Sequence, residues 1–134
     1  DVDKAPTDEG STTLFAEAQK GHMEVVRFLV EEGKADVDKA TTDDGSTPLF
    51  AAAQNGHTEV VRFLVEEGKA DVDKVNKKNQ TPINMAAFYG QLEVVQFLLS
   101  KGADCTIEDK WGLTPLARAQ KQGHAEVAAA LAGN

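Results

Sequence analysis

Residues 45–61 read Gly-Ser-Thr-Pro-Leu-Phe-Ala-Ala-Ala-Gln-Asn-Gly-His-Thr-Glu-Val-Val. Thr47 stands directly before Pro48, as a hydroxyl cap stands before a proline in the first turn of a helix. The alanine-rich run that follows predicts a helix over 49–55. Gly56 is placed to end that helix in the left-handed conformation, where a residue without a Cβ is favoured.

A second helix is predicted over 58–67, because valine, phenylalanine and leucine form one wide apolar face there. Residues 68–73 read Gly-Lys-Ala-Asp-Val-Asp. The glycine ends the helix, and the alternating residues predict an extended segment leading to a hairpin-like turn near Lys78 and Asn79. Helices this short are below the roughly 12–15 residues that persist alone in water. Such helices are stable when they stack on neighbours, which predicts a solenoid.

The same unit occurs four times along the chain. Residues 1–40 agree with residues 36–75 at 33 of 40 positions. The threonine that opens each unit recurs at spacings of 35, 34 and 33 residues, as Thr12, Thr47, Thr81 and Thr114. A repeat of this length indicates one supersecondary unit that is used several times.

These motifs resemble the ankyrin repeat over essentially the whole chain. The resemblance implies an all-α fold, an ankyrin-repeat solenoid of four stacked helix-turn-helix repeats joined by hairpin-like turns. It implies a single domain over 1–134, with repeats at about 8–41, 43–76, 77–109 and 110–134. Asp-Val-Asp at the start matches the end of the first unit, so residues 1–7 are interpreted as the remnant of a preceding repeat's exit strand.

The chain departs from the family at the histidine that usually follows Thr-Pro-Leu. In the family that imidazole ties the first helix to neighbouring backbone, so we expect an apolar substitute in the first two copies and a weaker link in the others. The substitutes are Phe15, Phe50, Asn84 and Ala117. Three phenylalanines share one position of the second helix and are expected in the core: Phe28, Phe63 and Phe97. Lys34 and Lys69 are one-residue insertions, expected in loops.

Composition and charge exclude several function classes. The 134 residues are 41 % hydrophobic and 27 % charged, as in a globular protein. The longest apolar runs, such as 127–132, are far shorter than the roughly 20 residues of a membrane span. A net charge of −8 opposes binding to nucleic acid or an anionic membrane. No secretory signal is visible and Cys105 is the sole cysteine, so a cytoplasmic monomer is expected.

No catalytic, metal or cofactor site is predicted. The three histidines, His22, His57 and His124, occupy one repeat position, and stacking would hold neighbours too far apart to share an ion. They are expected to act as entry residues of the second helix. The Asp-Val-Asp pairs at 36–38 and 71–73 lack the six to eight oxygens of a calcium site. No nucleophile–base order or phosphate loop stands out, so the chain is not expected to be an enzyme.

What remains is a binding surface. In the ankyrin family the concave face is built from turn tips and the outward residues of the first helix, and it binds proteins or peptides. Carried onto this chain, the resemblance implies anchors at Met85, Phe88, Tyr89 and Trp111, with Lys77, Lys78 and Lys110 as the rim. The first-helix positions of the last copy on this face are Arg118, Lys121 and Gln122. The resemblance implies further contacts at Asp43, Asp44, Gln54, Asn55, Gln80 and Leu113. Aromatic anchors within a polar rim are typical of binding hot spots.

Alternatives stay open at this point. Phe88, Tyr89 and Trp111 could instead pack between neighbouring repeats. The near-identical copies are also compatible with a laboratory-made ankyrin binder or scaffold, although the unequal spacings oppose this reading. A third reading is a structural spacer cut from a longer ankyrin array.

Overall fold

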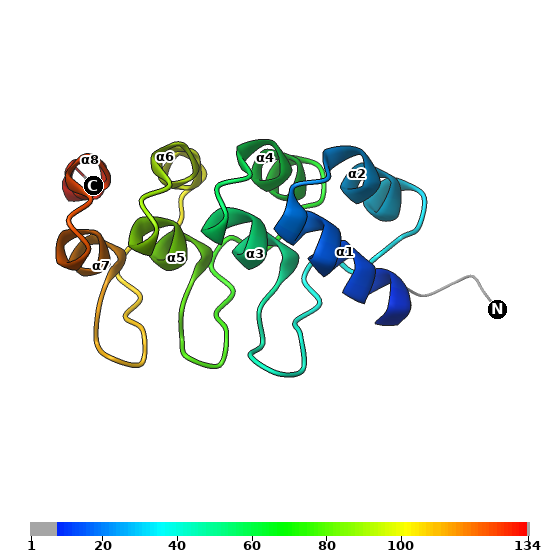
Figure 1. The fold of residues 1–134 in the computed structure, drawn as a ribbon, viewed down its shortest axis with the longest axis horizontal. Helices are drawn as coiled ribbons and strands as arrows, with labels where there is room; N and C mark the ends of the chain where they lie inside the picture. Colours follow the sequence, from blue (N-terminus) through cyan, green and yellow to red (C-terminus); the bar gives the residue numbers. More distant parts are fainter. Residues whose placement is uncertain (1–7, 134) are drawn as a thin grey trace.

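The computed structural model describes residues 8–133, with side chains from residue 12 onward. Within this range the chain forms eight helices and no strand, in two parallel rows (Figure 1). The odd-numbered helices form one row, from which the long loops project, and the even-numbered helices form the other. The expectation for residues 1–7 lies outside the described part. The helices are α1 (Asp8–Lys20), α2 (Met23–Glu31), α3 (Pro48–Gln54), α4 (Thr58–Glu66), α5 (Pro82–Phe88), α6 (Leu92–Ser100), α7 (Pro115–Lys121) and α8 (Ala125–Ala132).

Threonine and proline start three of the four odd helices as predicted. The hydroxyls of Thr47, Thr81 and Thr114 each accept a hydrogen bond from the backbone N–H three residues later, and proline follows each of them. The first copy has Thr13 in place of that proline. Its α1 extends back to Asp8, so the turn expected at the start of this copy is helical instead.

One contiguous core lies between the two rows. Leu14, Leu49 and Ile83 of the odd row are fully buried, as are Val61 and Val95 of the even row. Phe50 is buried as an apolar substitute for the family histidine. The Asn84 amide instead donates to the Asp109 carboxylate and the Leu113 carbonyl, both at a long 3.4 Å. Burial of Phe50 confirms the apolar substitute in the second copy, while the weaker link expected at Asn84 stays a prediction.

The prediction that all three helix-2 phenylalanines are core residues was wrong for Phe28. Phe63 and Phe97 are 5 % and 6 % exposed, but Phe28 is 60 % exposed. Arg27 covers the Phe63 ring at 4.9 Å from its centroid, and an arginine of α4 covers Phe97 in the same way. This position therefore faces the preceding helix of its row, and α2 is the first described helix of that row (Figure 1). The neighbouring repeat, not the residue type, determines the burial.

Side chains at the entry of the even helices connect consecutive repeats. The His57 Nε2 lies 2.9 Å from the carbonyl oxygen of Gln19, and the His124 Nε2 lies 3.0 Å from that of Phe88. Gln91 takes the same place in the third copy and donates to the carbonyl of Gln54 at 2.9 Å. The expected role of the histidines as helix-entry residues is confirmed, because His22, His57 and His124 directly precede α2, α4 and α8.

Glycine is required beneath these side chains. Gly90 has φ +72°, and a Cβ on it would lie 2.8 Å from the His124 ring. Gly123 has φ +76° with open space around the same position. Alanine in the left-handed region costs about 1–2 kcal/mol, and displacing His124 loses a hydrogen bond worth about 1 kcal/mol. We therefore expect Gly90→Ala to lower the free energy of unfolding by at least about 2 kcal/mol.

Urea unfolding of Gly90→Ala beside Gly123→Ala separates the two contributions. Gly123→Ala places alanine in the left-handed conformation without a clash with a side chain. Its free energy of unfolding should therefore fall by about 1 kcal/mol less than that of Gly90→Ala. Equal losses would show that the histidine moves aside without penalty.

The Asp-Val-Asp segments at 36–38 and 71–73 were expected to be extended, but both form turns. The Asp71 carboxylate accepts the N–H of Asp73 at 3.0 Å, which folds the segment on itself. Asp38 accepts the N–H of Asp71 at 3.1 Å, and Asp73 accepts that of Asp104 at 2.9 Å. Part of the chain's acidic excess therefore connects successive repeats.

The inserted lysines lie in the loops, as expected, and adopt the left-handed conformation. Lys34 and Lys69 have φ of +56° and +59°. Gly102 takes this conformation in the third copy, with φ +82°. The preceding Gly68 does not have a positive φ, so the insertion moves the left-handed residue from glycine to lysine.

Candidate partner-binding surface

The turn tips before α5 and α7 are each held by the side chain of the first residue of the turn. The side-chain oxygen Oδ1 of Asn76 accepts the N–H groups of Lys78 and Gln80, both at 2.9 Å. A carboxylate oxygen of Asp109 accepts the N–H groups of Trp111 and Leu113, both at 3.0 Å. These contacts fix the direction in which the tip residues project.

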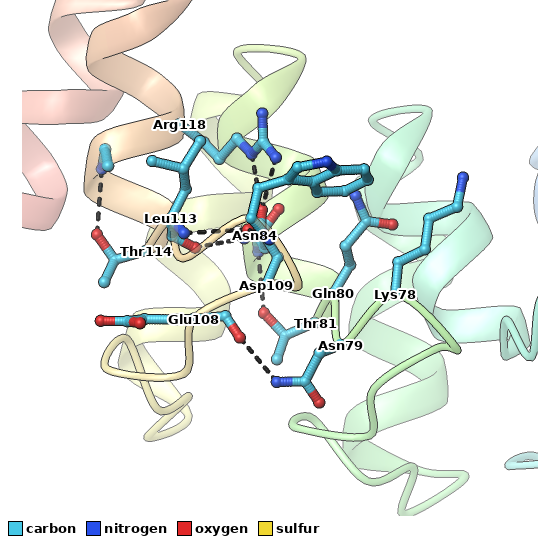
Figure 2. A network of polar contacts seen from close by, with 12 residues as sticks. Lys78, Asn79, Gln80, Thr81, Asn84, Glu108, Asp109, Leu113, Thr114 and Arg118 are labelled. Carbon is cyan, nitrogen blue, oxygen red and sulfur yellow. Dashed lines mark hydrogen bonds and ion pairs between the residues drawn. The ribbon is translucent and has the colours of Figure 1, made fainter.

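Backbone hydrogen bonds connect successive tips. The Lys77 N–H donates to the Asp44 carbonyl at 2.9 Å, and the Lys110 N–H donates to the Lys78 carbonyl at 2.9 Å. The Asn79 amide donates to the Glu108 carbonyl at 2.7 Å (Figure 2). The tips therefore form one connected edge of the solenoid.

A groove of about 520 Å³ lies where the last two tips meet α5 and α7. Six of the predicted partner-binding residues line it, together with Arg118 and Lys121. Those six are Gln80, Met85, Phe88, Tyr89, Trp111 and Leu113. The fold thus gathers side chains from two repeats into one hollow.

The aromatic side chains of the groove differ in exposure. Tyr89 and Trp111 are 49 % and 53 % exposed, whereas Phe88 is half-buried and Met85 is buried. The Phe88 and Tyr89 rings meet edge to face with centroids 4.8 Å apart. Met85 and Phe88 therefore form the floor, and Tyr89 and Trp111 stand above it.

A buried ion pair supports the Trp111 side of the groove. Arg118 donates to one carboxylate oxygen of Asp109 from two nitrogens, both at 2.8 Å (Figure 2). Both side chains are largely removed from solvent. The same guanidinium lies 5.3 Å from the Trp111 ring centroid and 5.7 Å from that of Phe88, within cation–π range. Arg118 therefore connects the tip, α7 and both aromatic rings.

Burial and hydrogen bonding act in opposite directions on Asp109. Burial favours the neutral acid and raises its pKa, but the N–H of Leu113, the Arg118 guanidinium and the N–H of Trp111 stabilise the carboxylate. The net effect holds the pKa of Asp109 below its usual range. The pair is therefore charged, and its two charges offset each other.

No role was predicted for Asp109 or Asn76. Both stand five residues before the threonine that caps the next helix. Asparagine or aspartate at the first position of a turn, accepting the backbone two residues on, is a recognised turn signature. That signal was present in the sequence and identifies both residues as supports of the tips.

The lysines predicted on the surface lie along the tips. The Lys110 Nζ is 5.2 Å from the Trp111 ring centroid. Lys78 is exposed beside it in the preceding tip. Lys77 is exposed too, but its Nζ donates to the Thr42 carbonyl at 2.7 Å. Lys110 therefore lies against the Trp111 wall of the groove and Lys78 lies exposed in the preceding tip, while Lys77 connects to the acidic tip.

Asp43 and Asp44 lie on the tip before α3, away from this groove. Asp43 instead borders a separate hollow of about 380 Å³ together with Phe15. The N–H of Asp44 and the hydroxyl of Thr41 lower the pKa of Asp43. Burial raises the pKa of Asp44, but the Thr41 hydroxyl and Ser46 outweigh it and lower that pKa. Both carboxylates are therefore ionised at neutral pH.

Gln54 and Asn55 contact the neighbouring repeats and do not line the groove. The Asn55 amide donates to the Gln19 carbonyl at 3.0 Å. The Gln54 carbonyl accepts from Gln91, and its side chain is half-buried. These two residues lie on α3 and its C-cap, one repeat away from the aromatic cluster.

Neither a metal-binding cluster nor a membrane-spanning helix is found among the described residues. Within 8–133, no group of three or more histidine, cysteine, aspartate or glutamate side chains is arranged to hold a metal ion. No helix in that part of the chain combines the length and apolar character needed to cross a membrane. Burial, followed by the charges of Asp104 and Asp73, raises the pKa of the Cys105 thiol.

Comparison with known proteins agrees with the repeat geometry. A search of curated proteins finds no match for this chain. The family model described as ankyrin repeats, in three copies, matches residues 1–76, 18–109 and 68–134. Ankyrin repeats are generally protein–protein interaction modules and are typically not enzymes. Because these matches together span the whole chain, the protein belongs to the ankyrin repeat family.

Proposed function

We propose that this chain binds a protein or peptide partner through the concave face formed by the turn tips and the odd-numbered helices. The observation that carries the proposal is the groove between α5 and α7, above which Tyr89 and Trp111 are each about half exposed. Large half-exposed aromatic side chains beside a hollow are typical of binding hot spots.

The exposed fractions favour binding over packing for two of the three aromatic residues. A tryptophan that served mainly to pack repeats together would be largely buried, but Trp111 is 53 % exposed. Phe88 is half-buried and contacts both Tyr89 and Arg118, so it supports the other rings from below. Tyr89 and Trp111 are therefore the anchors in this proposal.

Rigid presentation is the proposed mechanism. The tips are held by Asn76 and Asp109 and connected to each other through backbone hydrogen bonds. Since the groove residues are already ordered, binding loses little conformational entropy on this side of the interface. The partner's interactions can then contribute more fully to affinity.

Replacing either anchor should weaken binding without unfolding the protein. We expect Trp111→Ala or Tyr89→Ala to reduce the affinity for a captured partner by at least about 2 kcal/mol, or about 30-fold. Both side chains are half exposed, so helicity and the melting temperature should barely change. The measurement is affinity capture with the wild-type chain beside the Trp111/Tyr89 double variant, followed by titration of the recovered partner.

Phe28→Ala is the matched control, because Phe28 is an exposed aromatic residue on α2, away from the groove. If Phe28→Ala weakened partner binding as much as the anchor variants do, the partner would bind exposed apolar side chains in general, and the proposed site would be refuted. Unfolding of the last two repeats in the anchor variants would identify these residues as structural and would also refute it.

A further inference from the structure

We propose that the groove recognises an extended acidic segment, with one bulky apolar side chain seated between Tyr89 and Trp111. This inference rests on the proposed function of the same face and adds the chemistry of the partner. Three features support it: the shape of the groove, the positive charge around it and the negative charge of the tip before α3.

The shape of the groove fits an apolar side chain with its flanking backbone. The groove measures about 520 Å³. Its floor is apolar, formed by Met85 and Phe88, and its walls include Tyr89, Trp111 and Leu113. Pockets that enclose small ligands measure roughly 300–1,000 Å³. An aromatic or long aliphatic side chain would displace water from these rings, which is the main favourable contribution expected here.

The charge around the groove is positive, although the whole chain carries −8. Arg118 and Asp109 neutralise each other in the buried pair, so neither adds net charge. Lys78, Lys110 and Lys121 remain, all exposed. These cations favour carboxylates on the partner at both sides of the apolar anchor.

The nearby acid Glu108 does not cancel this charge. Its side chain extends away from Lys78 and Arg118, on the far side of the tip (Figure 2). A Cβ built on Gly112 would lie 4.0 Å from its carboxylate, which places that group beside the glycine. Lys121 lines the groove, Lys110 lies over the Trp111 ring and Lys78 lies in the preceding tip. Within the described residues, none of the three lysines forms an ion pair with an acidic side chain.

The acidic tip before α3 determines in which direction the bound segment runs. Asp43 and Asp44 lie two tips away from Lys110 along the connected edge, and both are ionised. Two helix diameters are on the order of 20 Å, which about six extended residues span. A partner with a basic residue about six positions from its acidic, apolar-anchored part would match both ends.

The test uses a displayed library of random sixteen-residue peptides, selected on the whole chain at physiological salt. Enriched peptides are synthesised with a fluorophore and titrated by anisotropy against four proteins: wild type, Trp111→Ala, the Lys110→Glu/Lys121→Glu double variant and the Lys34→Glu/Lys69→Glu double variant. The last is the matched control, because it makes the same charge change at loops after the even helices. A single-stranded oligonucleotide is titrated in parallel.

The expected result is enrichment of peptides with an aromatic residue, leucine or methionine beside aspartate or glutamate. Their affinity should fall at least about 10-fold in Trp111→Ala and in the groove charge variant. It should stay within about 2-fold in the loop control and weaken as salt is added, because exposed charges are screened.

The other outcomes overturn the inference in different ways. Trp111-dependent peptides without acidic residues, unaffected by the groove charge variant, would overturn the acidic partner and leave the proposed function standing. Peptides indifferent to Trp111→Ala would refute both. A library without binders would overturn the peptide class, while the partner capture described above judges the proposed function. Tighter binding of the oligonucleotide than of any peptide would make nucleic acid the ligand and overturn the inference.

Discussion

Phe63→Ala is expected to lower the free energy of unfolding by at least about 3 kcal/mol, whereas Phe28→Ala should lower it by less than about 1 kcal/mol. Phe63 is 5 % exposed and covered by Arg27, so truncation removes a buried ring and leaves a cavity between α2 and α4. Phe28 is 60 % exposed on the outer side of α2, and its truncation loses little burial.

Urea unfolding followed by circular dichroism measures both values. The pair is closely matched, because the eight residues 24–31 are identical to residues 59–66. Helix propensity therefore changes equally in the two variants, and the difference reports on tertiary packing. Equal losses would mean that Phe28 is covered in solution as Phe63 is, and the difference in burial between the two positions would be refuted.

Arg118→Leu is expected to lower the free energy of unfolding by about 3 kcal/mol or more, because it leaves a buried carboxylate without its cation. Asp109 would keep its backbone donors, but the side chain that donates from two nitrogens would be gone. Trp111 and Phe88 would also lose the guanidinium that lies beside their rings.

Glu66→Gln is the control for this ion pair. It breaks the exposed contact between Lys101 and Glu66 at 3.1 Å and should change the free energy of unfolding by less than about 1 kcal/mol. The Arg118→Leu/Asp109→Asn double variant should regain part of the free energy of unfolding that Arg118→Leu loses, because no charge then remains buried. A loss of under about 1 kcal/mol in Arg118→Leu would show that water replaces the guanidinium.

The loss in Arg118→Leu should also depend on pH. In the wild-type chain the folded pKa of Asp109 is below its unfolded value, so the carboxylate contributes stability above the unfolded pKa of about 3.9. This contribution disappears as the pH falls through the lower folded pKa. The difference between wild type and variant should therefore be full at neutral pH and shrink in acid. A difference that is constant from pH 7 to pH 2.5 would assign the loss to packing alone.

Local signals in the sequence predicted most of the repeat architecture. Threonine followed by proline marked the starts of α3, α5 and α7, and the hairpin-like turn near Lys78 lies where it was expected. These features depend on residues within a few positions of each other, so they can be read without the fold. The missing proline at Thr13 was also visible, but its consequence, a longer α1, was not anticipated.

The candidate site was predicted in part. The resemblance to the ankyrin family, carried over by repeat register, assigned Met85, Tyr89 and Trp111 to one surface, because turn tips and first helices form the concave face in that family. The structure brings these three side chains into one groove. The supporting pair of Asp109 and Arg118 was missed, since their contact depends on how the tip folds back over α7. Gln54 and Asn55 satisfy this register too, yet they bond to adjacent repeats.

The sequence Glu-Val-Val-Arg-Phe-Leu-Val-Glu, present at 24–31 and at 59–66, separates what the sequence by itself determines from what the tertiary structure decides. Both copies form a helix with the same apolar face, because helix formation and amphipathicity depend on residues within one or two turns. Val60 is 1 % exposed, but its counterpart Val25 is 42 % exposed. Burial requires atoms from another segment, and α2 supplies them to α4 while no described helix supplies them to the outer side of α2.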